Sequence, residues 1–228
     1  MNSPNHNNKR AQLSNDSEYT HEHEIEYVHE HDLVYEHEHA LGLPRRPNKI
    51  LYWLGGVGLR ALGGWRMVGR IPDVNKAIIA VAPHTSNWDF MVGLMVKFRL
   101  GLHVNFLGKH TLFRFPLKYF LTRIGGIPVR RDSANGVVGS MAEAFTARQQ
   151  LILVVAPEGT RKSVSAWRTG FLHIAKQARV PVIPVAFDYA QRRILFGPLI
   201  LVGDDISEAL TRVQAFTAQA QGKIAENG

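Results

Sequence analysis

The chain has 228 residues, of which 45% are apolar and 20% charged, and this composition excludes a wholly disordered or collagen-like protein. It contains no Cys, which excludes disulfides, thiolate metal sites and cysteine nucleophiles. The first thirty residues hold no apolar segment behind a basic one. We therefore expect no cleaved secretion signal and a protein that stays on the cytoplasmic side.

Charge is unevenly distributed along the chain. Residues 1–40 carry nine acidic and two basic side chains, a net charge of −7, which leaves 25 basic and ten acidic side chains, a net charge of +15, on residues 41–228. A basic domain attracts nucleic acid, an anionic membrane surface or phosphorylated substrates. No helix-turn-helix, zinc-finger or RNP pattern accompanies the charge, so nucleic acid is not expected as a partner.

The acidic segment is also rich in histidine. It holds seven of the eleven His, and three octads begin at His21, His29 and His37. We interpret it as a solvated, low-complexity tail that is predicted to be disordered, because it has few large apolar side chains to offset the entropy of ordering. Metal chelation by His at alternate positions of an extended strand and a mis-assigned start codon are the alternatives. The chain is therefore divided into a tail, 1–47, and a domain, 48–228.

The first part of the domain is predicted to be helical, because apolar residues recur there every three or four positions. These residues are Ile50, Leu54, Val57, Ala61 and Trp65. Five Gly in the same stretch weaken an isolated helix, so a supporting surface is expected. Two interpretations stay open: a helix packed on the core, or a helix in the membrane interface over 48–72 with Trp53 and Trp65 near the headgroups. The apolar run 50–59 is too short to span a bilayer.

After Pro72, short aliphatic runs alternate with segments of helical periodicity. This alternation predicts the α/β class, with a central mixed sheet covered by helices. The expected strands cover 77–82, 103–107, 126–129, 151–155, 182–187 and 193–197. The expected helices cover 88–99, 111–124, 135–149, 167–178 and 205–221. Neither a G-x-G-x-x-G after a strand nor a Walker A motif occurs.

The segment from His84 to Asp89 directly follows an expected strand. Ser86 and its neighbours suit the N-cap of a helix, which places Asp89 in the first turn, where the helix dipole favours a carboxylate. With His84 in the loop, Asp89 can fold back and hold the imidazole in the tautomer whose other nitrogen accepts a proton. The pair is a candidate general base, and a structural His at a strand end is the alternative. Ser86 lacks the G-x-S-x-G elbow of a serine hydrolase.

A second polar motif, Pro157 to Arg161, follows the expected strand 151–155. Open α/β sheets bind ligands at this end of their strands. Gly159 permits close backbone approach, while Glu158 and Arg161 offer an acceptor and a planar cation. A Glu–Arg pair in a tight turn is the alternative interpretation.

A third motif pairs two glycines with two arginines around the expected strand 126–129. Gly125 and Gly126 begin it, and Arg130 and Arg131 end it. Arginine suits bidentate phosphate binding, although a solvated basic edge would have the same sequence.

Taken in order, these motifs resemble the blocks of the glycerolipid acyltransferase family, which includes lysophosphatidic acid acyltransferase. The resemblance covers about residues 50–200. The matching segments are His84 to Asp89, Gly108 to Arg131, Pro157 to Arg161 and Val180 to Val185, with Trp167 to Gly170 between the last two. Ala156, Lys162 and Arg130 depart from the family pattern within the blocks that hold the acceptor.

The resemblance implies an O-acyltransferase that moves a fatty acyl group from acyl-CoA or acyl-carrier-protein to the hydroxyl of a lysophospholipid, first of all 1-acylglycerol-3-phosphate. It implies no metal and no cofactor other than that acyl donor. His84 and Asp89 are implied to be catalytic, and the implied substrate-binding residues are Arg131, Glu158, Gly159, Thr160 and Arg161. With this activity, the basic charge favours a peripheral protein on the cytoplasmic face of an anionic membrane. Another lyso-lipid acceptor and a non-catalytic lipid binder are the alternatives.

Overall fold

Residues 42–129, 134–161 and 166–224 are described by the structure, a computed structural model. The chain divides into two compact units, Met1–Ala40 and Leu41–Gly228, and all described residues belong to the second. The predicted tail therefore lies almost wholly outside the described residues, and so does the candidate phosphate ligand Arg131.

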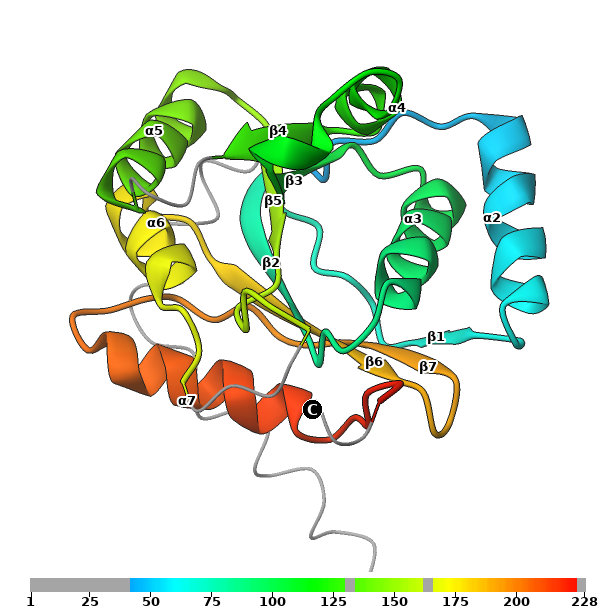
Figure 1. Cartoon of the computed structure of the whole chain (residues 1–228). Coiled ribbons are helices and arrows are strands. Elements are labelled where there is room, and N and C mark those ends of the chain that lie inside the picture. Colours follow the sequence, from blue (N-terminus) through cyan, green and yellow to red (C-terminus); the bar gives the residue numbers. More distant parts are fainter. Residues whose placement is uncertain (1–41, 130–133, 162–165, 225–228) are drawn as a thin grey trace, which may run out of the picture. The chain divides into compact units, whose positions relative to one another are not determined.

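Within the described residues, a seven-stranded mixed sheet has the order β1-β7-β6-β2-β5-β3-β4 (Figure 1). The strands are β1 (Arg66–Val68), β2 (Lys76–Ala82), β3 (Val104–Lys109), β4 (Gly126–Val129), β5 (Leu151–Val155), β6 (Val182–Asp188) and β7 (Arg193–Phe196). The strands from β6 to β4 in this order are mutually parallel, β7 is antiparallel to β6, and β1 is parallel to β7. The predicted α/β class with a central mixed sheet is confirmed, although β1 was not expected.

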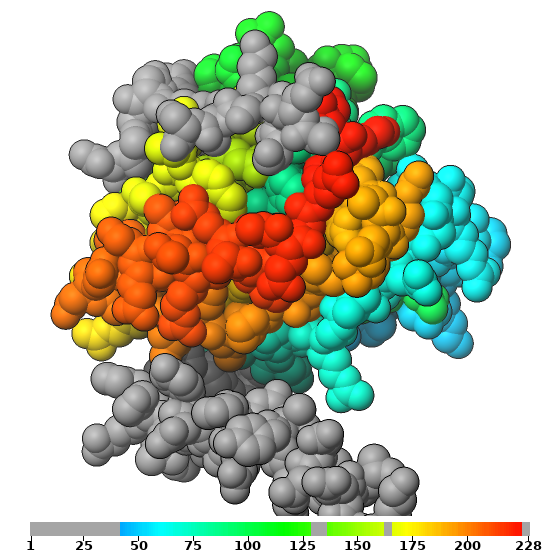
Figure 2. Space-filling model, turned by 90° about the horizontal axis from the view of Figure 1, so that it is seen from below, coloured from blue at the N-terminus to red at the C-terminus, as the bar shows by residue number. Residues whose placement is uncertain are grey.

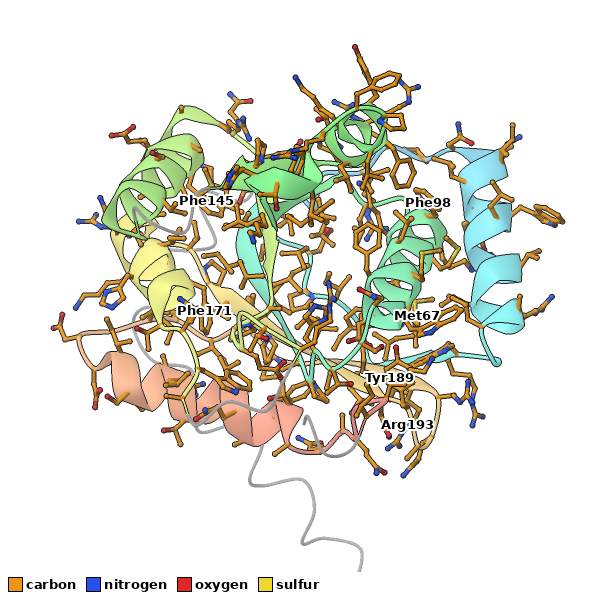
Figure 3. All side chains as sticks on the ribbon, viewed as in Figure 1. Met67, Phe98, Phe145, Phe171, Tyr189 and Arg193 are labelled. Atoms are coloured by element: carbon orange, nitrogen blue, oxygen red, sulfur yellow. The ribbon has the colours of Figure 1, made fainter. Side chains whose placement is uncertain are left out.

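Helices cover both faces of this sheet (Figure 1). They are α2 (Lys49–Ala61), α3 (Trp88–Leu100), α4 (Leu117–Arg123), α5 (Ala134–Ala147), α6 (Gly170–Ala178) and α7 (Ile206–Thr217). Figure 1 shows α2 and α3 on one side, with α5, α6 and α7 on the other. Figure 3 places Phe98 on the α3 side and both Phe145 and Phe171 on the opposite side.

Strand β2 contributes side chains to both cores, since successive residues of a strand point to opposite faces. Ala77 and Ile79 belong to the core beneath α3, whereas Ile78 and Ala80 belong to the core beneath α5, α6 and α7. All four are at most 5% exposed. Burial on both faces fixes the register of β2, and with it the position of the loop that follows Ala82.

Helix α2 packs against α3 through a glycine-bearing face. A Cβ added at Gly55 would lie 2.5 Å from the backbone nitrogen of Arg99, so only glycine allows this approach. Asn48 caps the helix, because its side-chain oxygen accepts hydrogen bonds from the amides of Ile50 and Leu51 at 2.9 and 3.1 Å. The supporting surface expected for this helix is therefore α3. Its outer face leaves apolar side chains exposed, among them Ile50 and Trp53.

Trp65 corrects the predicted extent of this helix. The helix ends at Ala61, because Gly63 and Gly64 adopt φ angles of 118° and 76° that helices do not use. Trp65 is only 6% exposed, and its ring packs edge-on against Phe187 and Tyr189. The interpretation that Trp65 lies near lipid headgroups is therefore wrong, and this tryptophan belongs to the core.

The helix predicted over 111–124 is interrupted. A single 3-10 turn covers His110–Leu112, and α4 begins only at Leu117. Pro116 explains the break, because proline lacks an amide hydrogen and its ring disfavours helical backbone at the preceding residue. Phe115, which precedes it, is 84% exposed, so an apolar side chain projects from this break.

Candidate active site

The loop after β2 leads directly into α3. Pro83 follows Ala82 through a cis peptide bond, and α3 begins at Trp88. The hydroxyl oxygen of Ser86 accepts a hydrogen bond from the amide of Trp88 at 3.2 Å, which satisfies one of the amides that have no partner within the helix. The expected helix start is confirmed, and Asp89 lies in the first turn of α3.

His84 and Asp89 are in direct contact. Nδ1 of His84 lies 3.1 Å from Oδ2 of Asp89. The carboxylate is buried, with its side chain 1% exposed, whereas the imidazole is 24% exposed. A carboxylate accepts hydrogen bonds only, so Nδ1 carries the proton and Nε2 is left with a lone pair. The structure thus brings together the two residues that the sequence predicts as a general-base pair.

Asp89 is held by two further residues. The amide of Ser86 donates to Oδ2 at 2.8 Å, while Oδ1 accepts from the Ser86 hydroxyl at 3.1 Å and from the Tyr189 hydroxyl at 2.6 Å. Burial by itself would raise the pKa of Asp89, but the hydrogen bonds from His84, Tyr189 and Ser86 outweigh it and lower that pKa. The carboxylate is therefore ionised at neutral pH. The hydroxyl of Ser86 is used in these contacts, whereas the N-cap residue itself is Asn87, whose side chain makes no capping bond.

The Pro157–Glu158 turn meets the same loop from the neighbouring strand. β2 and β5 are parallel neighbours, so their carboxyl ends lie at one edge of the sheet. Oε2 of Glu158 accepts a hydrogen bond from the backbone amide of His84 at 2.8 Å, and Glu158 is 7% exposed. Burial raises the pKa of Glu158, although the bond from the His84 amide partly offsets it. Glu158 therefore fixes the backbone position of the histidine.

Gly159 closes this turn in the left-handed region, at φ 68°. Its amide donates to the carbonyl of Ala156 at 3.1 Å, and a Cβ added to it would lie 2.5 Å from Nε of Arg168. The amide of Arg168 in turn donates to the carbonyl of Pro157 at 2.8 Å. The segment that leads into α6 thus packs on the turn, with the side chain of Arg168 against Gly159, and approach of a ligand to the Gly159 backbone stays a prediction.

Substrate binding by the other sequence-predicted residues stays a prediction. Thr160 and Arg161 are exposed at the end of the turn. Arg131 lies outside the described residues, and its predicted contact with a phosphate stays a prediction. Substrate binding by Glu158 also stays a prediction, since the contact found for it is with His84.

Tyr189 is the site residue that sequence reasoning missed. It directly follows β6, which lies beside β2 on the side opposite β5. A polar aromatic residue just after a buried strand is the only local signal, and using it requires the strand order. Figure 3 shows Tyr189 near the start of α3, where Asp89 lies.

The C-terminal segment lies across this part of the molecule. The amide of Tyr189 donates to the carbonyl of Gln221 at 2.8 Å, and the amide of Ile224 donates to the hydroxyl oxygen of Thr85 at 3.2 Å. Nζ of Lys223 lies 4.3 Å from the centre of the Trp88 ring. Figure 2 shows this segment in red on the surface beside the turn between β6 and β7. It therefore supports the β2–α3 loop from outside.

The described residues hold neither a three-residue metal site nor a membrane-spanning helix. Among residues 42–129, 134–161 and 166–224, no group of three His, Asp or Glu is placed to hold a metal ion. In the same ranges, no helix combines the length and the apolar character that crossing a bilayer requires.

A buried carboxylate, a partly exposed imidazole and a glycine turn at one edge of a mixed sheet define a candidate acyl-transfer site. Residues 66–188, just over half of the chain, match the family model described as Acyltransferase. The chain belongs to this acyltransferase family.

Two relatives carry more specific names. The chain is 26% identical over 163 residues to a 1-acyl-sn-glycerol-3-phosphate acyltransferase of Haemophilus influenzae, a match that covers 66% of this chain and 65% of that protein. It thus spans about two thirds of that relative's length. The crystal structure of PlsC, the 1-acyl-sn-glycerophosphate acyltransferase of Thermotoga maritima, is similar in fold, with a TM-score of 0.56 and 18% identity over 75% of this chain and 76% of that one.

Proposed function

We propose that the protein transfers a fatty acyl group from acyl-CoA or acyl-carrier-protein to the hydroxyl of 1-acylglycerol-3-phosphate, giving phosphatidic acid. The observation that carries the proposal is the 3.1 Å contact of His84 with buried Asp89 at the carboxyl edge of β2. It is supported by the match to the acyltransferase family and by the name of the Haemophilus relative.

In this mechanism the imidazole of His84 acts as general base. Nε2 takes the proton of the acceptor hydroxyl while the hydroxyl oxygen attacks the thioester carbon. The carbon–sulfur bond then breaks, and the imidazolium returns the proton to the leaving thiolate. The products are an ester and a free thiol, and no acyl-enzyme forms. Asp89 stabilises the imidazolium by its negative charge and keeps Nδ1 protonated.

Two backbone amides of the loops at this site are already used within the fold. The amide of His84 donates to Glu158, and the amide of Gly159 donates to Ala156. Neither is therefore an oxyanion donor in this arrangement. The negative charge that develops on the thioester oxygen therefore requires other donors, and the exposed guanidinium of Arg161 at the end of the turn is a candidate.

The acceptor and the donor are tested together with purified full-length protein in detergent micelles. Thiol release from palmitoyl-CoA, and acyl transfer from palmitoyl-acyl-carrier-protein, are measured with 1-acylglycerol-3-phosphate, with other lysophospholipids and with an amino-acid-derived lyso-lipid. The proposal predicts that 1-acylglycerol-3-phosphate gives the highest kcat/KM. A higher value for another lyso-lipid would replace the acceptor while leaving the reaction class intact.

We also propose that the protein works as a peripheral protein at a membrane surface. The outer face of α2 exposes Ile50, Trp53, Leu54 and Val57, which are 70%, 63%, 42% and 40% exposed. An amphipathic helix with such a face binds in the plane of a bilayer interface.

The double variant Ile50→Asp/Trp53→Asp should co-sediment at least ten times more weakly with phosphatidylglycerol vesicles. Leu199→Asp/Leu201→Asp, at two other exposed apolar positions, is the matched control; an equal loss in both would refute attachment through α2.

A further inference from the structure

A hollow of about 430 Å³ lies at the amino ends of β3 and β5. Four of the residues that line it are basic, namely Arg45, Arg46, His103 and Arg148, and none is acidic. We call this feature the basic hollow. The candidate active site lies at the carboxyl edge of the same parallel strands, and the seven residues of β2 span roughly 20 Å between the two edges. The basic hollow is therefore separate from His84.

In the part of the chain that the structure describes, no carboxylate forms an ion pair with the arginines of the basic hollow. Among residues 42–129, 134–161 and 166–224, the ion pairs of Asp89, Asp188 and Asp204 involve none of its arginines. Nη1 of Arg45 donates to the carbonyl of Leu100 at 3.3 Å, where α3 ends.

Helix ends offset only part of this charge. Arg148 directly follows the carboxyl end of α5, and Arg45 contacts the carboxyl end of α3 at Leu100. Each helix end contributes about half a negative charge. Together they offset roughly one of the three arginine charges.

The pKa values of two neighbouring basic groups are lowered, in part by this excess positive charge. Burial lowers the pKa of His103, and the nearby charges of Arg46, Lys97 and Arg148 lower it further. Burial likewise lowers the pKa of Lys97, with a further contribution from Arg46. The amine of Lys97 donates to the carbonyl of Ile124, which keeps it fixed beside this cluster. The cations thus repel one another in the free protein, and an anion placed among them would relieve that repulsion.

We propose that the basic hollow binds a phosphate-bearing anion. Arg46 and Arg148 approach it from separate segments, one before α2 and one after α5, and both are exposed, so their guanidinium groups can reach a ligand. Guanidinium groups bind phosphate oxygens in pairs of parallel hydrogen bonds. The amide side chain of Gln149 lines the same hollow and offers a further donor. The phosphate can belong to a lipid headgroup or to a soluble anion, and this binding does not depend on acyl transfer.

Two binding measurements on the full-length chain test the proposal and separate the two sources. The first is calorimetric titration with inorganic phosphate at low ionic strength. The second is co-sedimentation with phosphatidylcholine vesicles with and without phosphatidic acid. The test variant is Arg46→Ala/Arg148→Ala. Arg70→Ala/Arg212→Ala is the matched control, since it removes the same charge from two exposed positions away from the hollow.

The proposal predicts at least tenfold weaker binding by the test variant than by the control in one of these measurements. A loss for inorganic phosphate identifies a site open to soluble anions, whereas a loss confined to phosphatidic acid vesicles identifies a headgroup site. Equal binding by the two variants in both measurements would overturn the proposal. His84→Ala should bind like the wild type, which separates this site from the candidate active site.

A spectroscopic measurement on the unmodified chain gives an independent check. The ring signals of His103, identified by their loss in His103→Gln, should shift when the anion fills the hollow, and their titration midpoint should rise. Unshifted His103 signals at saturating phosphate and at saturating phosphatidic acid vesicles would also overturn the proposal.

Discussion

The hydroxyl of Tyr189 donates a 2.6 Å hydrogen bond to Oδ1 of Asp89, across 100 positions of sequence. The bond joins the residue after β6 to the first turn of α3, on the side of Asp89 away from His84. The bond holds the carboxylate of Asp89 in place, and that carboxylate in turn holds the imidazole of His84. Tyr189 is therefore a positioning residue for the candidate base.

Tyr189→Phe should reduce kcat by about three- to thirtyfold, because hydrogen bonds to charged groups contribute about 1.5–3 kcal/mol when buried and only part of this acts on the base. Loss of this donor also leaves more negative charge on Asp89, which holds the imidazolium of His84 more strongly, so the acid limb of the pH profile of kcat should move to higher pH. The ring still packs on Trp65 at a centroid distance of 4.7 Å, so the fold should be kept. Tyr119→Phe, at an exposed position of α4, is the control. An unshifted acid limb in Tyr189→Phe would show that this bond does not act on the base.

Glu158 offers a test that separates positioning of His84 from binding of the acceptor. In Glu158→Gln the amide oxygen can still accept the bond from the His84 backbone, whereas Glu158→Ala leaves that amide without its 2.8 Å partner. If Glu158 positions His84, Glu158→Gln should have a near-normal kcat and a near-normal acceptor KM. Glu158→Ala should lose about 1–3 kcal/mol in the free energy of unfolding and should have a lower kcat. A raised acceptor KM in Glu158→Gln would instead assign Glu158 to the substrate.

The same residue gives a pH dependence of stability. Burial raises the pKa of folded Glu158, so the folded state holds its proton to higher pH than the unfolded state does. The free energy of unfolding should therefore fall as pH rises from the unfolded value near 4.3 through the raised folded value. Glu158→Gln should remove this fall. Chemical denaturation of both proteins between pH 4 and 8 measures the difference, and parallel curves would contradict it.

Gly159→Ala should destabilise the turn that carries Glu158. The φ angle of 68° costs a residue with a Cβ about 1 kcal/mol or more, and the added carbon would lie 2.5 Å from Nε of Arg168. We expect a loss of about 1–3 kcal/mol in the free energy of unfolding and a lower kcat. Gly203→Ala is the matched control, since nothing lies within 4 Å of its added Cβ. Equal stability of the two variants would show that the turn adapts without cost.

Local sequence patterns predicted the parts of the fold that depend on local chemistry. Strand β2 and the start of α3 follow from aliphatic runs and capping residues. The His84–Asp89 contact follows from placing His84 in the loop and Asp89 in the first turn of the helix. Apolar periodicity alone extended one helix past Gly63 and started another before Pro116.

Contacts set by strand order were not predictable in the same way. Tyr189 reaches Asp89 only because β6 lies beside β2, and Arg46 and Arg148 come together only because β3 lies beside β5. No local pattern distinguishes these residues from ordinary surface groups.

The most direct test of the central claim is acceptor-dependent thiol release by His84→Ala. Palmitoyl-CoA or the acyl-carrier-protein thioester serves as donor, whichever the wild type uses, and His173→Ala, an exposed histidine on α6, is the control. General-base catalysis contributes about 10²–10⁴ in rate, so kcat should fall at least about a hundredfold in His84→Ala and stay near the wild-type value in His173→Ala. A His84→Ala protein that is correctly folded and keeps wild-type kcat would contradict the account.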